Sequence, residues 1–313
     1  MTTHPSELVV NWHVTEACNY DCRYCYAKWH AEAKDKELIH DADASHALLA
    51  EIYRQFAPEP DNHARLGMKW EALRLSLAGG EPLLYSEKII RIARQAQAIG
   101  FKVSLITNGS RLTLPLMREL APVLSVLGLS IDSTNDSTNR SIGRADRHED
   151  VLALSGLAGI IKHGQQLNPD LRLKINTVVN TLNCTENMSS LIEQLAPDKW
   201  KVLRMLPTIT DDLAITEPEF AQFVERHQKL GNILSAEDNS DMVESYIMID
   251  PHGRFFQNSL IDGGYRYSQP ILKLGAHAAF HEVQWQPRKF QARYALDFRK
   301  STDAYTHLPI TLL

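Results

Sequence analysis

The chain has 313 residues, which is long enough for one large α/β domain or two small ones. Its residues are 44% hydrophobic and 23% charged, a composition typical of a globular protein. Its net charge of -5 provides no general attraction to nucleic acid or to an anionic membrane, so a polyanionic ligand would need a local cluster of cations. No apolar run is long enough to span a bilayer, and the first residues lack the features of a signal peptide. We therefore expect a cytoplasmic protein that binds neither nucleic acid directly nor a membrane.

Short β-type runs alternate with helical stretches over the first two thirds of the sequence. Six strands are predicted, at Leu8–Thr15, Leu73–Ala78, Lys102–Thr107, Val126–Ile131, Leu171–Val179 and Lys199–Leu206. Helices are predicted between them, at Ala42–Phe56, Ser86–Ile99, Leu114–Leu120, Glu149–His163 and Asn187–Gln194. This alternation predicts an α/β fold with a parallel sheet and right-handed crossovers. Because a full barrel needs eight units, six units predict a partial (βα)6 TIM-like barrel with its active site at the carboxyl ends of the strands.

The second predicted strand separates apolar from polar side chains. Leu73, Leu75 and Leu77 would pack under the helices, so Arg74 and Ser76 would point into the barrel. The same alternation recurs in the first, fourth and fifth strands. Parallel strands buried on both faces usually carry continuous apolar runs, so this pattern predicts a polar interior that holds a ligand or much water.

A different pattern follows Pro207. The sequence predicts a helix at Glu217–Leu234, a polar loop at Ser235–Asp241, a strand at Ser245–Asp250 and a turn at Pro251–Arg254. The aromatic tail from Ile261 onward is interpreted as a cap over the open barrel. We therefore divide the chain into a barrel at residues 1–210 and a C-terminal extension at residues 211–313 that completes and caps the active site within a single structural unit.

Three of the four cysteines, Cys18, Cys22 and Cys25, lie close together directly after the first predicted strand. Thiolates are suited to iron–sulfur clusters, zinc or copper(I). A four-iron cluster normally takes one cysteine per iron, so three cysteines leave one iron open to a substrate or a cofactor. A Cys3His zinc site completed by a histidine such as His13 or His30 is the alternative.

A Gly-Gly-Glu-Pro sequence follows the second predicted strand at residues 79–82. Gly79 and Gly80 would permit close approach of the backbone to a ligand, and Glu81 would accept hydrogen bonds from an ammonium group. For this short sequence by itself, a plain turn is the alternative interpretation.

The C-x3-C-x2-C spacing and the downstream glycine pair together resemble the radical S-adenosylmethionine (SAM) enzymes, and Tyr24 beside the last cysteine also fits this family. The resemblance implies a 4Fe-4S cluster on the three cysteines, with the open iron chelating SAM. It also implies that the Gly-Gly-Glu sequence contacts the amino group of SAM. In this family, an electron from the cluster cleaves SAM to a 5'-deoxyadenosyl radical.

Asn108, Ser130 and Arg144 follow or end the third and fourth predicted strands and are candidate SAM contacts. Arg144 would pair with the SAM carboxylate, because a guanidinium group binds carboxylates bidentately. Taken alone, Asn108 is a turn residue and Arg144 is a solvated surface charge, so both assignments depend on the resemblance.

The resemblance narrows to the viperin family through several short segments in the same order and spacing between Asn11 and Asn258. These segments are Asn11–Thr15, Ser130–Ser133, Ile142–Arg144, Lys174–Asn180, Trp200–Val202 and Glu244–Tyr246. Viperins convert a nucleoside triphosphate to its 3'-deoxy-3',4'-didehydro form, an antiviral chain terminator. Vertebrate viperins carry an amphipathic helix ahead of the cluster. Only seventeen residues precede Cys18 here, so we expect the chain to be more like the prokaryotic members that act in antiphage defence.

Cations from three predicted strands would meet the triphosphate of such a substrate. Arg74, Lys174, Lys199 and Lys201 would supply positive charge, and Asn176 would hydrogen-bond a phosphate or a ribose hydroxyl. For each cation separately, a solvated strand end is the alternative. Arg74 stands where viperins commonly have lysine, which keeps the charge.

Three further positions bear on the resemblance. Tyr246 matches the viperin tyrosine that is proposed to donate a proton or a hydrogen atom, although an ordinary half-buried tyrosine is the alternative. Asn239 also matches the family pattern and is expected to contact substrate. Ala78 replaces a serine of the family, which removes one hydroxyl near SAM.

The viperin resemblance implies that CTP, UTP or GTP loses its 4' hydrogen to the radical and then its 3' hydroxyl. We expect flavodoxin or ferredoxin to donate electrons to the enzyme. We also expect the enzyme to be a monomer. Within radical SAM enzymes, a peptide maturase or a glycyl-radical activase is the alternative. Maturases typically bind auxiliary clusters through C-terminal cysteines, whereas Cys184 is the only cysteine after Cys25. A zinc-stabilised nucleotide-binding module is the alternative that is not an enzyme.

Overall fold

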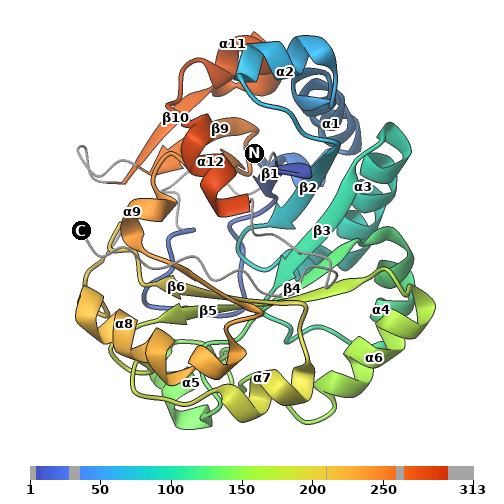
Figure 1. The fold of residues 1–313 in the computed structure, drawn as a ribbon. Helices are drawn as coiled ribbons and strands as arrows, with labels where there is room; N and C mark the ends of the chain where they lie inside the picture. Colours follow the sequence, from blue (N-terminus) through green and yellow to red (C-terminus); the bar gives the residue numbers. More distant parts are fainter. Residues whose placement is uncertain (1–4, 28–35, 209, 259–263, 295–313) are drawn as a thin grey trace.

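The structure is a computed structural model that describes residues 5–27, 36–208, 210–258 and 264–294. Within these residues, ten strands form one sheet in the order β10-β9-β8-β1-β2-β3-β4-β5-β6-β7 (Figure 1). The strands are β1 (Glu7–His13), β2 (Ala72–Ala78), β3 (Lys102–Thr107), β4 (Val126–Ser130), β5 (Arg172–Val179), β6 (Lys199–Arg204), β7 (Leu234–Glu237), β8 (Ile247–Ile249), β9 (Arg254–Asn258) and β10 (Tyr265–Pro270). The run from β8 through β1 to β7 is parallel, while β9 pairs antiparallel with both β8 and β10.

Helices cover the outer side of the curved parallel sheet (Figure 1). The α-helices are α1 (Ala42–Phe56), α2 (Pro60–Leu66), α3 (Ser86–Ile99), α4 (Leu114–Leu120), α5 (Asp136–Ile142), α6 (Leu157–Leu167), α7 (Ser189–Leu195), α8 (Glu217–Arg226), α9 (Asn239–Met242), α10 (Ile271–Leu274), α11 (Ala276–Phe280) and α12 (Pro287–Tyr294). Short 3-10 turns lie at Leu38–His40, Pro82–Tyr85, Ala121–Val123 and Gln228–Leu230. The parallel strands and the helices between them form the predicted partial barrel.

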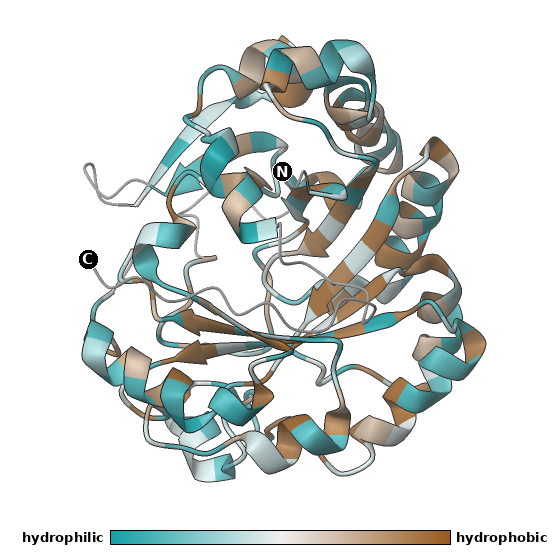
Figure 2. Ribbon diagram, viewed as in Figure 1, coloured by the Kyte–Doolittle hydropathy of each residue, from teal (hydrophilic) through white to brown (hydrophobic). Residues whose placement is uncertain are grey.

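The hydrophobic core lies between the sheet and these helices. Leu73, Leu75 and Leu77 on β2 are at most 1% exposed and belong to this core. The intervening Arg74 and Ser76 line a cavity on the other face of the sheet. Figure 2 shows the corresponding apolar bands along the strands and on the inward sides of the helices. The predicted alternation is therefore confirmed on β2, although apolar side chains such as Val9 and Ile106 line the cavity as well.

All six predicted strands are present, with small shifts at their ends. Helices α1, α3 and α4 have the predicted bounds, and the predicted Asn187–Gln194 helix is α7. Local signals explain this agreement. The Asp41 side chain caps α1 by accepting hydrogen bonds from two backbone N–H groups, and Gly100 follows the last residue of α3.

The predicted helix at Glu149–His163 is wrong in its first half, because α6 begins only at Leu157. Glu149 and Gly156 both have positive φ angles, 64° and 84°, which a helix does not permit. The Asp146 carboxylate accepts hydrogen bonds from two backbone N–H groups further along the chain and forms a turn instead.

The predicted helix at Glu217–Leu234 and the loop at Ser235–Asp241 are also wrong. Helix α8 ends at Arg226, and the next regular strand is β7 at Leu234–Glu237. This strand pairs parallel with β6 and adds a seventh strand to the predicted six in the described part of the chain. Its sequence, Leu-Ser-Ala-Glu, lacks the apolar alternation that identifies a strand.

The chain after residue 210 joins the same sheet as the barrel. The strand predicted at Ser245–Asp250 is present as β8, next to β1, and the predicted turn leads into β9. Part of the tail that we interpreted as a cap, residues 261–263 and 295–313, lies outside the described residues. No helix in the described ranges is long and apolar enough to cross a membrane.

His227 follows α8 and is fully buried. Its Nε2 atom lies 2.9 Å from the backbone nitrogen of Met188, and its Nδ1 atom lies 2.8 Å from the carbonyl oxygen of Phe223. The neutral imidazole satisfies both contacts, with Nδ1–H donating and Nε2 accepting. Burial lowers the pKa of His227 below its usual value of 6.5.

We expect the free energy of unfolding to fall as the pH decreases below about 6.5, because the unfolded chain then takes up a proton that folded His227 does not. His227→Gln keeps an acceptor but cannot be protonated, so it should reduce this slope by up to about 1.4 kcal/mol per pH unit. Urea denaturation between about pH 5 and 7 measures the slope. Buried His13 contributes in the same direction in both proteins, since burial lowers its pKa to about 3. An unchanged slope in the variant would contradict this prediction.

Candidate active site

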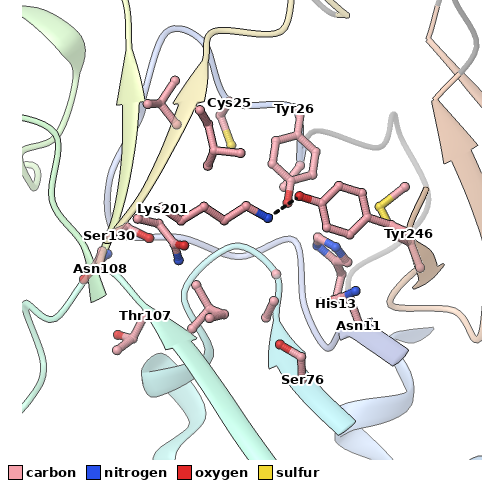
Figure 3. A pocket seen from close by; sticks show the side chains of 18 of the residues that line it. Asn11, His13, Cys25, Tyr26, Ser76, Thr107, Asn108, Ser130, Lys201 and Tyr246 are labelled. Carbon is pink, nitrogen blue, oxygen red and sulfur yellow. Dashed lines mark hydrogen bonds between the residues drawn. The ribbon is translucent and has the colours of Figure 1, made fainter. Parts of the chain in front are cut away.

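A cavity of about 270 Å³ lies on the inner face of the barrel. Figure 3 shows side chains from several strands and from the cysteine loop pointing into it. The sequence-predicted residues that line it are Cys18, Cys22, Cys25, Arg74, Gly79, Gly80, Asn108, Ser130, Arg144, Lys174, Asn176, Lys201 and Tyr246. The structure thus brings the candidate cluster, SAM and substrate residues to one place.

Glu81, Lys199 and Asn239 are not among the residues that line this cavity. Lys199 is buried and stands opposite Lys174 in the pairing of β5 with β6. Asn239 is the first residue of α9. With its amide oriented to satisfy its neighbours, its oxygen accepts a hydrogen bond from Arg204, and Arg204 does line the cavity.

The cysteine loop, residues 18–25, has no regular secondary structure and is held by neighbouring loops. On one side, the Asp21 N–H donates to the Gly143 carbonyl oxygen at 3.1 Å, and the Arg23 N–H donates to the Ile142 carbonyl oxygen at 2.9 Å. Gly143 has a φ angle of 89°, and a Cβ atom there would lie 2.2 Å from the Asp21 carbonyl oxygen. Only glycine permits this approach without displacing the loop.

The residues after β2 also hold the segment, residues 15–17, that leads into the cysteine loop. The Gly80 N–H donates to the Thr15 carbonyl oxygen at 2.7 Å, and the Glu81 N–H donates to the Ala17 carbonyl oxygen at 2.8 Å. A Cβ atom on Gly80 would lie 2.2 Å from the Ala17 carbonyl oxygen. The observed close approach of this backbone is thus to the residues that lead into the cysteine loop, while its predicted approach to a ligand stays a prediction.

The donor set of the loop fits a 4Fe-4S cluster. Burial raises the pKa of the Cys18 thiol to about 11 and that of the Cys22 thiol to about 12, so a metal must displace their protons when it binds. Among the described residues, no three His, Cys, Asp or Glu side chains are placed to hold a single metal ion. In a four-iron cluster each thiolate binds a different iron, so this arrangement of the three thiols fits such a cluster.

The Glu81 carboxylate is fully buried and points toward the end of β3. It accepts hydrogen bonds from the Thr107 hydroxyl at 2.7 Å, from the Asn108 N–H at 2.7 Å and from the Leu83 N–H at 2.9 Å. Burial raises the pKa of Glu81, and these hydrogen bonds oppose that shift. Glu81 therefore fixes the loop after β3, which carries Asn108, against the glycine pair.

Arg144 is buried rather than solvated, with 7% of its surface exposed. Its guanidinium lies 3.4 Å from the Asp132 carboxylate, donates to the Tyr24 hydroxyl at 3.2 Å and donates to the Ser130 carbonyl oxygen. Tyr24 in turn donates to Asp132. Burial opposes the charge on Arg144, but Asp132, Tyr24 and Cys22 together outweigh it and raise the pKa of the arginine. These residues tie the cysteine loop to the end of β4.

The register of the parallel strands places polar side chains side by side on the inner face. Asn176 on β5 stands opposite both Ser130 on β4 and Lys201 on β6. Arg74, in the first half of β2, also lines the cavity. Its Nε atom already has an anionic neighbour, because it lies 3.0 Å from a carboxylate oxygen of Glu7 on β1.

Sequence reasoning missed two charged residues that contact this group. Glu237 at the end of β7 forms a 2.5 Å ion pair with Lys201, and Arg293 on α12 forms a 2.6 Å ion pair with Glu237. Burial raises the pKa of Glu237, but the two cations outweigh it and lower the pKa to about 2. Burial also lowers the pKa of Lys201. Neither Glu237 nor Arg293 lies near a recognisable motif.

Sequence reasoning considered His13 only as an alternative zinc ligand, and the structure places it in the lining of the cavity at the end of β1. Its ring makes edge-on contacts with the rings of Tyr26 and Phe256, at centroid distances of 5.8 and 5.3 Å. With a pKa of about 3 caused by burial, the imidazole is neutral at physiological pH. The inward position of His13 in the strand alternation was the available signal.

Comparisons of the sequence with known proteins identify close relatives. The Radical SAM superfamily matches residues 12–158, which include the cysteine loop, the glycine pair and Arg144. A protein of Psychrobacter lutiphocae named S-adenosylmethionine-dependent nucleotide dehydratase is 44% identical over 92% of this chain and 95% of its own length. A protein of Pseudoalteromonas ulvae with the same name is 38% identical over 93% of this chain and 94% of its own length.

The fold is similar to that of solved radical SAM structures. The structure of native anSMEcpe with bound AdoMet has a TM-score of 0.56 and 13% sequence identity, and covers 94% of this chain and 84% of that chain. This likeness supports the predicted partial barrel and, at that identity, the fold alone. Because relatives with 38 to 44% identity match almost the whole length, this chain belongs to the S-adenosylmethionine-dependent nucleotide dehydratases of the radical SAM superfamily, as its resemblance to viperins implied.

Proposed function

We propose that this chain converts a nucleoside triphosphate to its 3'-deoxy-3',4'-didehydro analogue, with CTP, UTP and GTP as the candidate substrates. The observation that carries the proposal is the meeting of the cysteine loop with Lys174, Asn176 and Lys201 in one cavity. The names of the relatives as nucleotide dehydratases support it. The product would act as an antiviral chain terminator in antiphage defence.

Cys18, Cys22 and Cys25 would hold the 4Fe-4S cluster, and SAM would lie against the backbone of Gly79 and Gly80. When bound, these groups supply a 5'-deoxyadenosyl radical that removes the hydrogen from the 4' carbon of the ribose. Arg144 already pairs with Asp132, so its remaining donors would serve the SAM carboxylate. Asn108 and Ser130, which line the same cavity, would complete the SAM contacts.

The inner-face cations would bind the triphosphate and hold the ribose in place. Lys174, Lys201 and Asn176 are the nearest candidates, because a triphosphate carries about four negative charges and is met by charged hydrogen bonds. Arg74 and Lys199 would add positive potential at longer range, and Asn239 would act through the adjacent Arg204. Binding in the cavity would displace water from around the reacting ribose.

Tyr246 is the proposed donor of the proton or hydrogen atom that the 3' hydroxyl takes up when it leaves as water. Its hydroxyl lies 2.8 Å from the Lys201 ammonium, so it is next to the proposed phosphate site. One further electron is needed, and we propose flavodoxin or ferredoxin as its source. We also propose a monomer that acts in the reducing cytoplasm, where the thiols stay available for the cluster.

The first test is a product assay with the anaerobically reconstituted protein. CTP, UTP, GTP and ATP are incubated in parallel with SAM and dithionite, and 5'-deoxyadenosine and nucleotide products are measured by mass spectrometry. We expect one nucleotide to stimulate 5'-deoxyadenosine formation and to lose the mass of water. If none of the four does so, the proposed function is wrong.

Lys174→Ala should weaken nucleotide binding by about 1.5 to 3 kcal/mol, because a charged hydrogen bond to phosphate is lost. This corresponds to roughly a tenfold to hundredfold higher Kd, which equilibrium dialysis measures. Cleavage of SAM without product should persist. Lys162→Ala, on the exposed face of α6, is the matched control. Equal affinities of the Lys174→Ala and Lys162→Ala proteins would exclude Lys174 from the phosphate site.

Gly143→Ala should lower cluster loading, because its Cβ atom would collide with the carbonyl oxygen of Asp21 in the cysteine loop. Iron and sulfide content after reconstitution, with the broad absorbance near about 400 nm, measures the loading. Gly159→Ala is the control, since a Cβ atom at that exposed helical position meets nothing within 4 Å. Full loading of both variants would show that the close approach at Gly143 does not hold the cluster loop.

A further inference from the structure

The barrel remains open between β7 and β8, which are not neighbours in the order of the sheet. Four side chains span this gap. Lys201 comes from β6, Glu237 from β7, Tyr246 from the residue before β8, and Arg293 from α12. The side chains of Lys201, Glu237 and Arg293 are buried and Tyr246 is partly buried, and Figure 3 shows Lys201 and Tyr246 meeting within the cavity.

Glu237 contacts each of the other three. One carboxylate oxygen lies 2.5 Å from the Lys201 ammonium. The other accepts a hydrogen bond from the Tyr246 hydroxyl at 3.0 Å and lies 2.6 Å from the Arg293 guanidinium. The carboxylate is therefore the group on which the polar contacts of Lys201, Tyr246 and Arg293 converge.

The position of Tyr246 depends on this carboxylate. Its hydroxyl also accepts from Lys201 at 2.8 Å, and the Arg293 guanidinium lies 3.3 Å from the centre of its ring. If the charge of Glu237 were removed, two buried cations would face one phenol without the carboxylate that bridges them. The Tyr246 hydroxyl would then lose the charged acceptor that holds it between Lys201 and Arg293.

The loop that carries Tyr246 is also held by α12 and the residue before it. The Gln286 N–H donates to the Glu244 carbonyl oxygen at 2.9 Å, and Arg293 donates to the Ser245 hydroxyl at 2.8 Å. Glu244 has a φ angle of 59°, a conformation that a non-glycine residue adopts only when its surroundings enforce it. Because Arg293 also pairs with Glu237, its contacts connect the loop that carries Tyr246 to the end of β7.

We propose that Glu237 is a positioning residue that fixes the Tyr246 hydroxyl beside Lys201, and so aligns the hydrogen donor with the bound nucleotide. The inference rests on the proposed function, in which Tyr246 donates a proton or hydrogen atom and Lys201 binds phosphate. A buried carboxylate with two cations is expensive to desolvate, and apolar residues would bridge a gap between strands as well or better. This favours a role in aligning polar groups over a purely structural one.

The test is a double-mutant cycle of Glu237→Gln and Tyr246→Phe in the reconstituted enzyme, with the nucleotide that the wild-type protein uses. The measured quantity is the ratio of nucleotide product to 5'-deoxyadenosine. We expect each single variant to lower this ratio by about tenfold or more, and the double variant to be no worse than the Tyr246→Phe protein, because residues that act as a unit are not additive. Glu237→Asp, which keeps the charge on a shorter side chain, should restore part of the ratio.

Glu244→Gln is the matched control, because it also removes a carboxylate from the loop that carries Tyr246. The Glu244 carboxylate accepts a hydrogen bond from the Gln286 side chain. Its product ratio should equal that of the wild-type protein. A wild-type ratio in the Glu237→Gln protein, or multiplicative losses in the double variant, would overturn the proposal.

A second readout does not require activity. The full chain is prepared with 3-fluorotyrosine at position 246, and its fluorine NMR resonance is compared in the wild-type, Glu237→Gln and Glu244→Gln backgrounds. We expect a displaced, broadened resonance only with Glu237→Gln. An unchanged resonance would overturn the positioning role of Glu237, whereas a wild-type protein that makes no product from any nucleotide would overturn the proposed function instead.

Discussion

The close approach of backbone to backbone around the cysteine loop is the constraint on which the site depends. The loop has no regular secondary structure. Its N–H groups donate to carbonyl oxygens at the end of α5, and the segment that leads into it, residues 15–17, accepts hydrogen bonds from Gly80 and Glu81 after β2. At Gly80 and at Gly143, a Cβ atom would lie 2.2 Å from a carbonyl oxygen of this segment. Two glycine-containing turns are thus primarily supports for the three thiols, and they hold the loop at the edge of the cavity.

Charge is distributed so that cations gather at the cavity of a chain whose net charge is negative. Some of these cations are already matched by carboxylates: Arg144 by Asp132, Arg74 by Glu7 and Lys201 by Glu237. A buried cation without such a partner would lose its charge or destabilise the fold. These pairs therefore offset part of the desolvation cost of the buried cations, and the hydrogen bonds of each pair leave the remaining donors with a defined direction.

The sequence predicted those parts of the fold and site whose signals are local. Helix α1 was correctly bounded because Asp41 caps it, and Arg74 and Ser76 were correctly placed in the interior because strand side chains alternate. Helix α6 was wrong at its start, since the positive φ angle at Glu149 arises from a turn with no strong sequence signature. Strand β7 was missed because pairing with β6, and not its own composition, makes it a strand.

The charged residues at the gap between β7 and β8 also lack a local sequence signal, so sequence reasoning missed them. Glu237 and Arg293 are far apart in sequence, and they meet because β7 pairs with β6 while α12 packs on the loop before β8. A prediction would have required the correct strand order and the position of α12 together. The gap itself has a physical consequence, because strands that do not pair leave room for side chains from both edges to reach the cavity. An eight-stranded closed barrel fills its interior with packed side chains. In this open barrel, the cluster formed by Glu237 with Lys201, Tyr246 and Arg293 takes the place of part of that packing.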